Sequence, residues 1–127
     1  MQVELDPSVF SDDVYNLYVK YQVAIHRDSK EELTVNKFTQ FLVDSPLRSS
    51  GSDNQYGSFH QKYYIDNVLI AVAFLDILPN CVSSVYFIYD PDFGDLSLGT
   101  YSALREIATT YRLSLKYPSL KYYYLGI

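Results

Sequence analysis

The stretch 56–108 constrains the fold more than any other part of the chain, because three strand-like runs follow one another there and lead into a helix that opens on a glycine. The run 58–65 alternates its side chains with the two-residue period of a strand. The run 68–78 is almost continuously apolar, as in a central strand covered on both faces. A third strand is expected at Cys81–Tyr89, and the reversals fall at Asp66-Asn67 and Pro79-Asn80. These runs predict an antiparallel meander.

Helical periodicity precedes this meander. Spacings of three and four between apolar residues predict an amphipathic helix at Asp12–Ile25, capped by Ser11. Its expected buried stripe comprises Val14, Leu17, Tyr18, Tyr21, Ala24 and Ile25. A second helix is predicted at 35–42 with Thr34 as its cap. Its expected buried residues are Phe38, Phe41 and Leu42.

A strand–helix–strand unit is expected after the meander. The helix should begin between Ser97 and Thr100. Its expected buried residues are Tyr101, Leu104, Ala108 and Tyr111. Tyr122–Leu125 then forms a short strand. Because such crossovers are right-handed, the last two strands should be parallel neighbours in an otherwise antiparallel sheet.

Composition limits the class of protein. A length of 127 residues favours one domain, and 48% hydrophobic with 20% charged residues is typical of globular chains. No apolar run reaches the roughly 18 residues that span a bilayer. The single cysteine, Cys81, excludes an internal disulfide and supports no zinc site.

Charge argues against a nucleic-acid-binding domain that acts alone. The net charge is -5, which repels phosphate backbones, and the basic residues are scattered along the sequence. Tyrosine is unusually frequent, with 14 residues. Tyrosines suit both half-buried strands and base-stacking surfaces, and their number favours the sheet over the stacking platform.

The expected order of elements is that of the acyltransferase fold known as GNAT, an α/β (α+β) fold with a mostly antiparallel sheet and one parallel strand–helix–strand unit. The sequence also carries longer blocks: YQVAIHRD, FLVDSPL, YGSFHQKYYID, LIAVAFLDILPNCVSSVYFIYDPDF and LSLGTYSALREIA. In this order they resemble the C-terminal region of eukaryotic arginyl-tRNA-protein transferases. The resemblance extends over most of the chain, from about residue 15 to residue 126.

The resemblance implies an activity and its partners. Members of the family move arginine from Arg-tRNA to the N-terminal amine of proteins that begin with Asp, Glu or oxidised Cys, which marks those proteins for ubiquitin-dependent degradation in the N-degron pathway. It implies Arg-tRNA as co-substrate, proteins with acidic N-termini as partners, no membrane, and a cytoplasmic location with the nucleus as an alternative. No cofactor is expected in this chain.

The resemblance also bears on domain organisation. The family's N-terminal region, with its cysteine cluster of the iron–sulfur type, is not found in these residues, and the family pattern continues beyond the tyrosine strand. Residues 1–127 are therefore expected to form a single GNAT-like domain that is incomplete at its C-terminal end. Assembly with the N-terminal domain is expected in turn.

The candidate site residues come from chemistry and from the family blocks together. Aminolysis of an aminoacyl ester needs a neutral amine, an oriented carbonyl and donors near the developing oxyanion. His60 and Asp76 are the candidate catalytic residues, for proton relay and for holding the amine or the arginyl guanidinium. The candidate substrate-binding residues are Ser58, Ser83, Ser84, Gly99 and Arg105. The backbone at 85–89 could pair with an acceptor peptide.

Each candidate has a plainer interpretation. His60 could be a half-exposed sheet residue, and Asp76 could anchor the following turn. Arg105 could lie on a solvated helix face, and Gly99 could serve only the helix entry. The two serines could relieve packing. Asp90, Asp92 and Asp95 lack the closing glutamate of a calcium loop, so a turn explains them better than a metal site.

Two other functions stay open. The first is a GNAT-type acyl-CoA N-acyltransferase, but FGDLSLG carries no basic residue and departs from the coenzyme A loop pattern Q/R-x-x-G-x-G/A. The second is a non-catalytic truncated form that binds N-terminal peptides or a partner protein.

Overall fold

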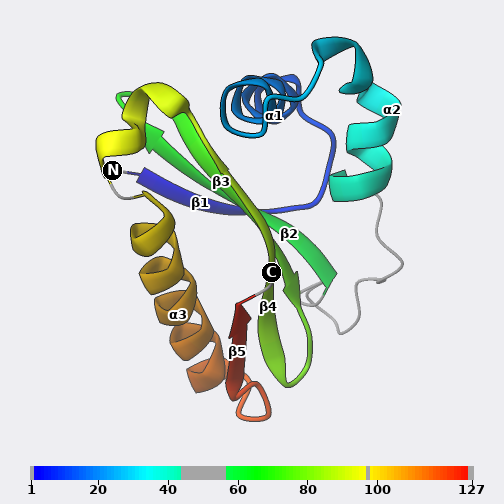
Figure 1. The fold of residues 1–127 in the computed structure, drawn as a ribbon. Helices are drawn as coiled ribbons and strands as arrows, with labels where there is room; N and C mark the ends of the chain where they lie inside the picture. Colours follow the sequence, from blue (N-terminus) through cyan, green and yellow to red (C-terminus); the bar gives the residue numbers. More distant parts are fainter. Residues whose placement is uncertain (1, 44–56, 97, 126–127) are drawn as a thin grey trace.

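The computed structural model describes residues 2–43, 57–96 and 98–125. One five-stranded sheet, ordered β1-β2-β3-β4-β5, is antiparallel except for the parallel pair β4 and β5. In Figure 1, α1 and α2 lie on one side of this sheet and α3 on the other. The elements are β1 (Gln2–Pro7), α1 (Asp12–Ile25), α2 (Val35–Phe38), β2 (Gly57–Ile65), β3 (Val68–Ile77), β4 (Cys81–Tyr89), α3 (Leu98–Lys116) and β5 (Tyr122–Leu125).

The predicted meander and the parallel pair are confirmed, and one strand was missed. β1 pairs antiparallel with β2 along six residues and extends the sheet at its edge. Val3 and Leu5 pack against the core on the α3 side. Their alternation with Gln2 and Glu4 was the available signal, but it is only a few residues long.

Alternation along β2 and β3, interrupted by a register shift at Tyr63/Tyr64, creates two hydrophobic cores. Phe59, Tyr63 and Leu75 belong to the core on the α3 side. Val72 and Phe74 belong to the core under α1 and α2. The apolar run in β3 is therefore the fully covered central strand that its sequence predicts, since 70–75 are all buried.

α1 has the predicted bounds, but part of its predicted stripe is wrong. Val14, Leu17 and Tyr18 are buried, whereas Ala24 and Ile25 are exposed. Gln22 takes a buried position instead, because its Nε2 donates a 2.7 Å hydrogen bond to Tyr86 Oη on β4. Ser11 occupies the N-cap position without a side-chain cap hydrogen bond.

α2 is shorter than predicted. Its Thr34 cap is confirmed, since Thr34 Oγ1 accepts from the Lys37 backbone N–H at 3.2 Å. The α-helix ends at Phe38 and continues as one π-helical turn, Thr39–Val43. The wider turn rotates the following side chains, so Leu42 is buried while Phe41 is 55% exposed, and the predicted burial of Phe41 is wrong.

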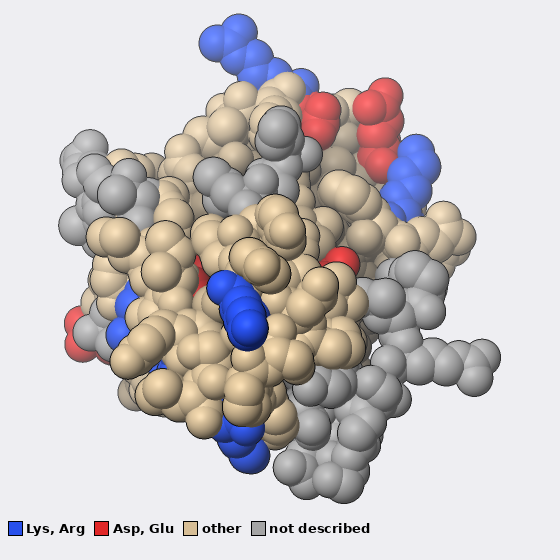
Figure 2. All heavy atoms as spheres, turned by 90° about the horizontal axis from the view of Figure 1, so that it is seen from below, with Lys and Arg blue, Asp and Glu red and all other residues tan. Residues whose placement is uncertain are grey.

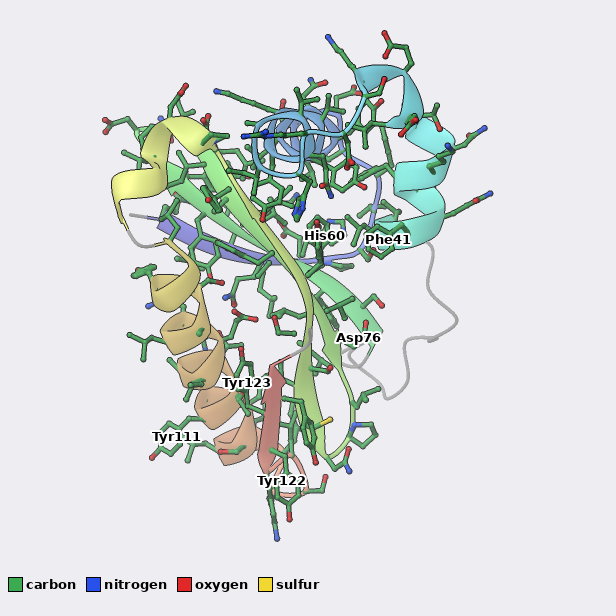
Figure 3. All side chains as sticks on the ribbon, viewed as in Figure 1. Phe41, His60, Asp76, Tyr111, Tyr122 and Tyr123 are labelled. Atoms are coloured by element: carbon green, nitrogen blue, oxygen red, sulfur yellow. The ribbon has the colours of Figure 1, made fainter. Side chains whose placement is uncertain are left out.

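α3 begins at Leu98, within the predicted interval. Its predicted buried face is right only for Tyr101, which packs against the core, whereas Leu104, Ala108 and Tyr111 are exposed. In Figure 3, Tyr111 points away from the sheet on the outer side of α3. Beside Tyr101 the helix turns polar residues to the sheet, where hydrogen bonds satisfy most of their polar atoms. The buried residues of α3 are Leu98, Ser102, Glu106, Thr109 and Thr110.

A register shift in β4 shapes the edge of the sheet. Phe74 pairs with Tyr86 and Leu75 with Ser84, so Val85 is an extra residue, as in a β-bulge. β5 pairs with Cys81–Ser84 alone. From Val85 to Tyr89, β3 is thus the only strand beside β4 within the described ranges.

Candidate functional site

A cavity of about 110 Å³ lies between the sheet and the π-helical turn Thr39–Val43 that follows α2. It brings together three of the predicted site residues, Ser58, His60 and Asp76, and Val85 of the bulge lines the same cavity. In Figure 3, Phe41, His60 and Asp76 all lie on the α2 side of the sheet. The other lining residues are Ser8, Phe41, Leu42, Val43, Phe59, Phe74 and Leu75.

Cross-strand pairing positions Asp76. Ser58 on β2 and Ser83 on β4 are its partners on either side, so all three side chains share one face of the sheet. Ser58 Oγ donates a 2.7 Å hydrogen bond to Asp76 Oδ1. Asp76 is only partly buried, so its carboxylate can meet a cation that enters the cavity.

His60 forms the inner wall of the cavity. Its side chain is 1% exposed, so the half-exposed interpretation does not hold. Nε2 donates to the Leu42 carbonyl at 3.0 Å and lies 3.2 Å from Ser8 Oγ, while the ring meets Phe74 edge-on at 4.8 Å. These contacts tie the π-helical turn to β2.

The proton on Nε2 leaves Nδ1 of His60 as an acceptor. Nδ1 is buried and has no hydrogen-bond partner within the described part of the chain. Burial lowers the pKa of His60, and the hydrogen bond to Leu42 opposes that shift in part. The neutral ring is therefore favoured, and its role in proton relay stays a prediction.

Ser83 shares the face of Asp76. The other predicted site residues, Ser84, Gly99 and Arg105, form a second group on the opposite face of the sheet and on α3. Ser84 pairs with Leu75 and turns to the α3 side, so the adjacent Ser83 and Ser84 do not line one cleft. Arg105 is partly buried, and its Nε has no hydrogen-bond partner within the described residues. Gly99 is exposed, and a Cβ there would meet nothing within 4 Å. The sheet separates this second group from the cavity.

A buried polar network between α3 and the sheet was missed by sequence reasoning. Ser102 Oγ donates to Glu106 Oε2 at 2.8 Å, and Tyr63 Oη lies 3.2 Å from Ser102 Oγ. Gln61 Nε2 donates to Tyr63 Oη at 2.7 Å, and Thr109 Oγ1 donates to Gln61 Oε1 at 3.0 Å. Because Gln61 donates to Tyr63, the hydrogen bonds of this network can all run in one direction, from Thr109 to Glu106.

Glu106 is a carboxyl group in an unusual position. It is 2% exposed, and burial raises its pKa, while the hydroxyls of Ser84, Ser102 and Tyr123 oppose part of the rise. Burial raises the pKa of Tyr123 to about 12. By hydrogen-bond geometry, Glu106 Oε1 and Tyr123 Oη have no partner within the described ranges. The sequence signal was the four-residue spacing from Ser102 to Glu106 on one helix face.

The acidic turn after β4 forms ion pairs with Lys20. Lys20 Nζ lies 2.9 Å from both Asp90 Oδ1 and Asp92 Oδ2. Asp90 also accepts from the Asp92 backbone N–H, which stabilises the turn. Across residues 2–43, 57–96 and 98–125, no three His, Cys, Asp or Glu side chains are grouped to hold a metal ion.

Within the same ranges, no helix combines the length and apolarity of a membrane span.

The lowered pKa of His60 predicts a pH-dependent stability. In the folded chain the ring resists protonation, so the stability that depends on the neutral form is full above about pH 6.5, the unfolded pKa, and is lost as pH falls through the folded pKa. His60→Gln keeps a donor near Leu42 but removes the titration. Between pH 7.5 and pH 5.0, the free energy of unfolding should fall more in wild type than in His60→Gln, by about 1.4 kcal/mol per pKa unit.

Urea unfolding at the two pH values measures this difference. His26→Gln, the same substitution at an exposed histidine, is the control for replacing an imidazole ring by an amide. An equal pH dependence in wild type and His60→Gln would contradict the burial of a neutral His60.

The model for the family described as "Arginine-tRNA-protein transferase, C terminus" matches residues 13–127. Arginyl-tRNA–protein transferase 1 of Drosophila melanogaster is 52% identical in an alignment 116 positions long that covers 88% of this chain and 24% of that protein. Arginyl-tRNA–protein transferase 2 of Arabidopsis thaliana is 44% identical in a gapped alignment 136 positions long that covers 99% of this chain and 22% of that protein. The chain thus spans about a quarter of the length of these curated relatives.

A bacterial relative and a solved structure extend the comparison. Aspartate/glutamate leucyltransferase of Stutzerimonas stutzeri is 35% identical over 129 residues, 97% of this chain and 49% of that protein. The crystal structure of a ribosomal-protein-alanine N-acetyltransferase from Brucella melitensis matches with a TM-score of 0.60 at 13% identity, over 100% of this chain and 80% of that one. The predicted GNAT fold is confirmed.

Proposed function

This chain belongs to the arginine-tRNA-protein transferase family and corresponds to its C-terminal part, and from that membership we propose that it takes part in moving arginine from Arg-tRNA to the N-terminal amine of a protein. The observation that supports this most directly is the Asp76 carboxylate, held by Ser58, in a cavity beside the Val85 bulge. Both substrates of this reaction bring a cation to such a site, the arginyl group and the acceptor ammonium.

In the proposed reaction the acceptor nitrogen attacks the carbonyl carbon of the arginyl ester. The new C–N bond forms, the C–O bond to the terminal ribose breaks, and the proton lost by the amine ends on the ribose oxygen. An α-amine with a pKa of about 8 is partly neutral at physiological pH, so positioning can supply most of the rate.

Three features of the cavity fit these steps. Asp76 attracts the cation that enters, and the unpartnered Nδ1 of His60 can accept a proton in transit. The bulge at Val85 disturbs the backbone pairing of β4, and an N–H released there could stabilise the negative charge that develops on the carbonyl oxygen.

Finer parts of the proposal come from the family resemblance. They are the preference for acceptors that begin with Asp or Glu, the link to ubiquitin-dependent degradation, and a location in the cytoplasm with the nucleus as an alternative. An iron–sulfur cluster, if the protein uses one, would belong to the family's N-terminal region.

A non-catalytic role is the second candidate. The Asp76 cavity lies within this chain, which spans 24% of the length of its Drosophila relative. Such a form would bind N-terminal peptides in the same cavity without transferring arginine.

Radiolabelled Arg-tRNA and a peptide that begins with Asp test the proposal. We expect label in the peptide with a free amine and none in the same peptide with an acetylated amine. The full-length Drosophila relative is the positive control. A chimera, in which this chain replaces the matching segment of that relative, tests the residues in their longer context. If the chimera binds both substrates but transfers nothing, the catalytic proposal fails and the binding role is favoured.

A further inference from the structure

The cross-strand row of Ser58, Asp76 and Ser83 continues to the edge of the sheet formed by β5. Register pairs Ser58 with Asp76, Asp76 with Ser83, and Ser83 with Tyr124. One line of side chains therefore runs across β2, β3, β4 and β5 on the same face. Asp76 and Tyr124 are two strand spacings apart, which is about 10 Å.

Two exposed tyrosine rings end this row. Tyr122 and Tyr124 alternate with Tyr123 on β5, and they are 55% and 57% exposed. Their ring centroids are 6.4 Å apart with an interplanar angle of 35°. Tyr123 points the other way, toward α3 and Glu106. Half-burial in a sheet, the general explanation for the many tyrosines, accounts for Tyr123 but not for Tyr122 and Tyr124.

The surroundings of these rings suit a base better than a phosphate. Figure 2 views the end of the molecule where α3, the turn 117–121 and β5 lie, and shows a broad uncharged surface with isolated Lys or Arg side chains. Stacking of a base needs an exposed aromatic face and does not depend on a charged side chain. Phosphate binding would need clustered cations, which the overall charge of -5 also disfavours.

We propose that Tyr124, supported by Tyr122, stacks on the terminal base of the aminoacyl-tRNA, while Asp76 and its two serines receive the cationic aminoacyl group. This assignment rests on the proposed function and names the substrate that occupies this face of the sheet. The negative Asp76 faces the arginyl cation, the aromatic pair faces the base, and the ribose bridges the gap between them. The cavity of about 110 Å³ that Asp76 lines is the space that receives the cationic end of the aminoacyl group.

The test uses a stable amide analogue of the substrate terminus, 3′-arginylamino-3′-deoxyadenosine, with L-argininamide as a probe that lacks the base. Tyr124→Ala and Tyr124→Thr should weaken binding of the nucleoside probe by about 5- to 150-fold, the range for loss of one base stack. Tyr124→Phe should bind it as wild type does. None of these changes should affect argininamide. Tyr111→Ala, at an exposed tyrosine on the outer side of α3, is the matched control.

Calorimetric titration at 50 and 200 mM salt gives the affinities, and the nucleoside probe should show little salt dependence. The proposal is overturned if Tyr124→Ala and Tyr124→Thr bind the nucleoside probe as tightly as wild type, or if they weaken argininamide equally. It is also overturned if wild type does not bind the nucleoside probe. Binding at Tyr124 of a peptide that begins with Asp, and not of the nucleoside probe, would overturn it as well. The transfer assay with the chimera is a separate readout, so a failure of the stacking proposal leaves the proposed function standing and can be told apart from a failure of the proposed function itself.

Discussion

Replacing Phe38 with alanine should lower the free energy of unfolding by about 3–5 kcal/mol. Phe38 is 1% exposed and lies at the centre of the aromatic cluster under α1. Its ring lies 5.1 Å from that of Tyr18, 5.4 Å from that of Tyr15 and 6.1 Å from that of Phe10. The regular part of α2 is only four residues long, so packing rather than helical hydrogen bonding holds it in place.

The same change three residues later provides the control. Phe41 is 55% exposed and contacts Tyr86 at 5.5 Å, so Phe41→Ala should cost much less than Phe38→Ala. Urea unfolding, followed by tyrosine fluorescence, measures both variants. Phe38→Ala should also displace the Leu42 carbonyl that holds His60, which a change in the His60 ring resonances would report. Equal losses from the two variants would show that α2 is not anchored through Phe38.

Local patterns predicted the sheet because burial and strand period agree there. The turns at 66–67 and 79–80 set the registers beside them, and a register shift in each hairpin changes the pairing further along. The apolar run in β3 could only be covered on both faces. The parallel pair followed from the handedness of crossovers. β1 escaped prediction because its alternation is too short to separate from chance.

The helices were predicted in position but not always in orientation. Apolar spacing on α3 indicated a buried stripe of Leu104, Ala108 and Tyr111, yet the sheet beneath offers Gln61 and Tyr63, which favour polar neighbours. Cross-sheet hydrogen bonds of this kind depend on which residues meet in three dimensions. Periodicity within one element cannot reveal them.

For the site, the sequence predicted residue types well and their grouping only in part. Ser58 and Asp76 come together because β2 and β3 form the predicted hairpin and a register shift at Tyr63/Tyr64, which was not predicted, brings them opposite each other. Ser83 and Ser84 were considered together, although consecutive strand residues necessarily face opposite sides. The full row to Tyr124 required the register of the parallel pair, which no local pattern fixes.

Asp76→Asn should lower kcat/KM for arginyl transfer by about 10- to 150-fold, the effect of losing a charged hydrogen bond worth about 1.5–3 kcal/mol. Asparagine keeps an oxygen to accept from Ser58, so the local fold should persist while the negative charge is lost. Ser58→Ala is the matched control, because it removes the hydroxyl that orients Asp76 but keeps the charge, and its loss should be smaller.

Steady-state transfer by the chimera, with the peptide concentration and then the Arg-tRNA concentration varied, also identifies the cation that Asp76 holds. If Asp76 holds the arginyl group, as the stacking geometry requires, the KM for Arg-tRNA rises and that for the peptide does not. A rise in the peptide KM alone would assign Asp76 to the acceptor amine and place the tRNA terminus elsewhere. If Asp76→Asn leaves transfer unchanged and lowers the free energy of unfolding, Asp76 only anchors the turn at 79–80. The cavity would then not be the site of the reaction.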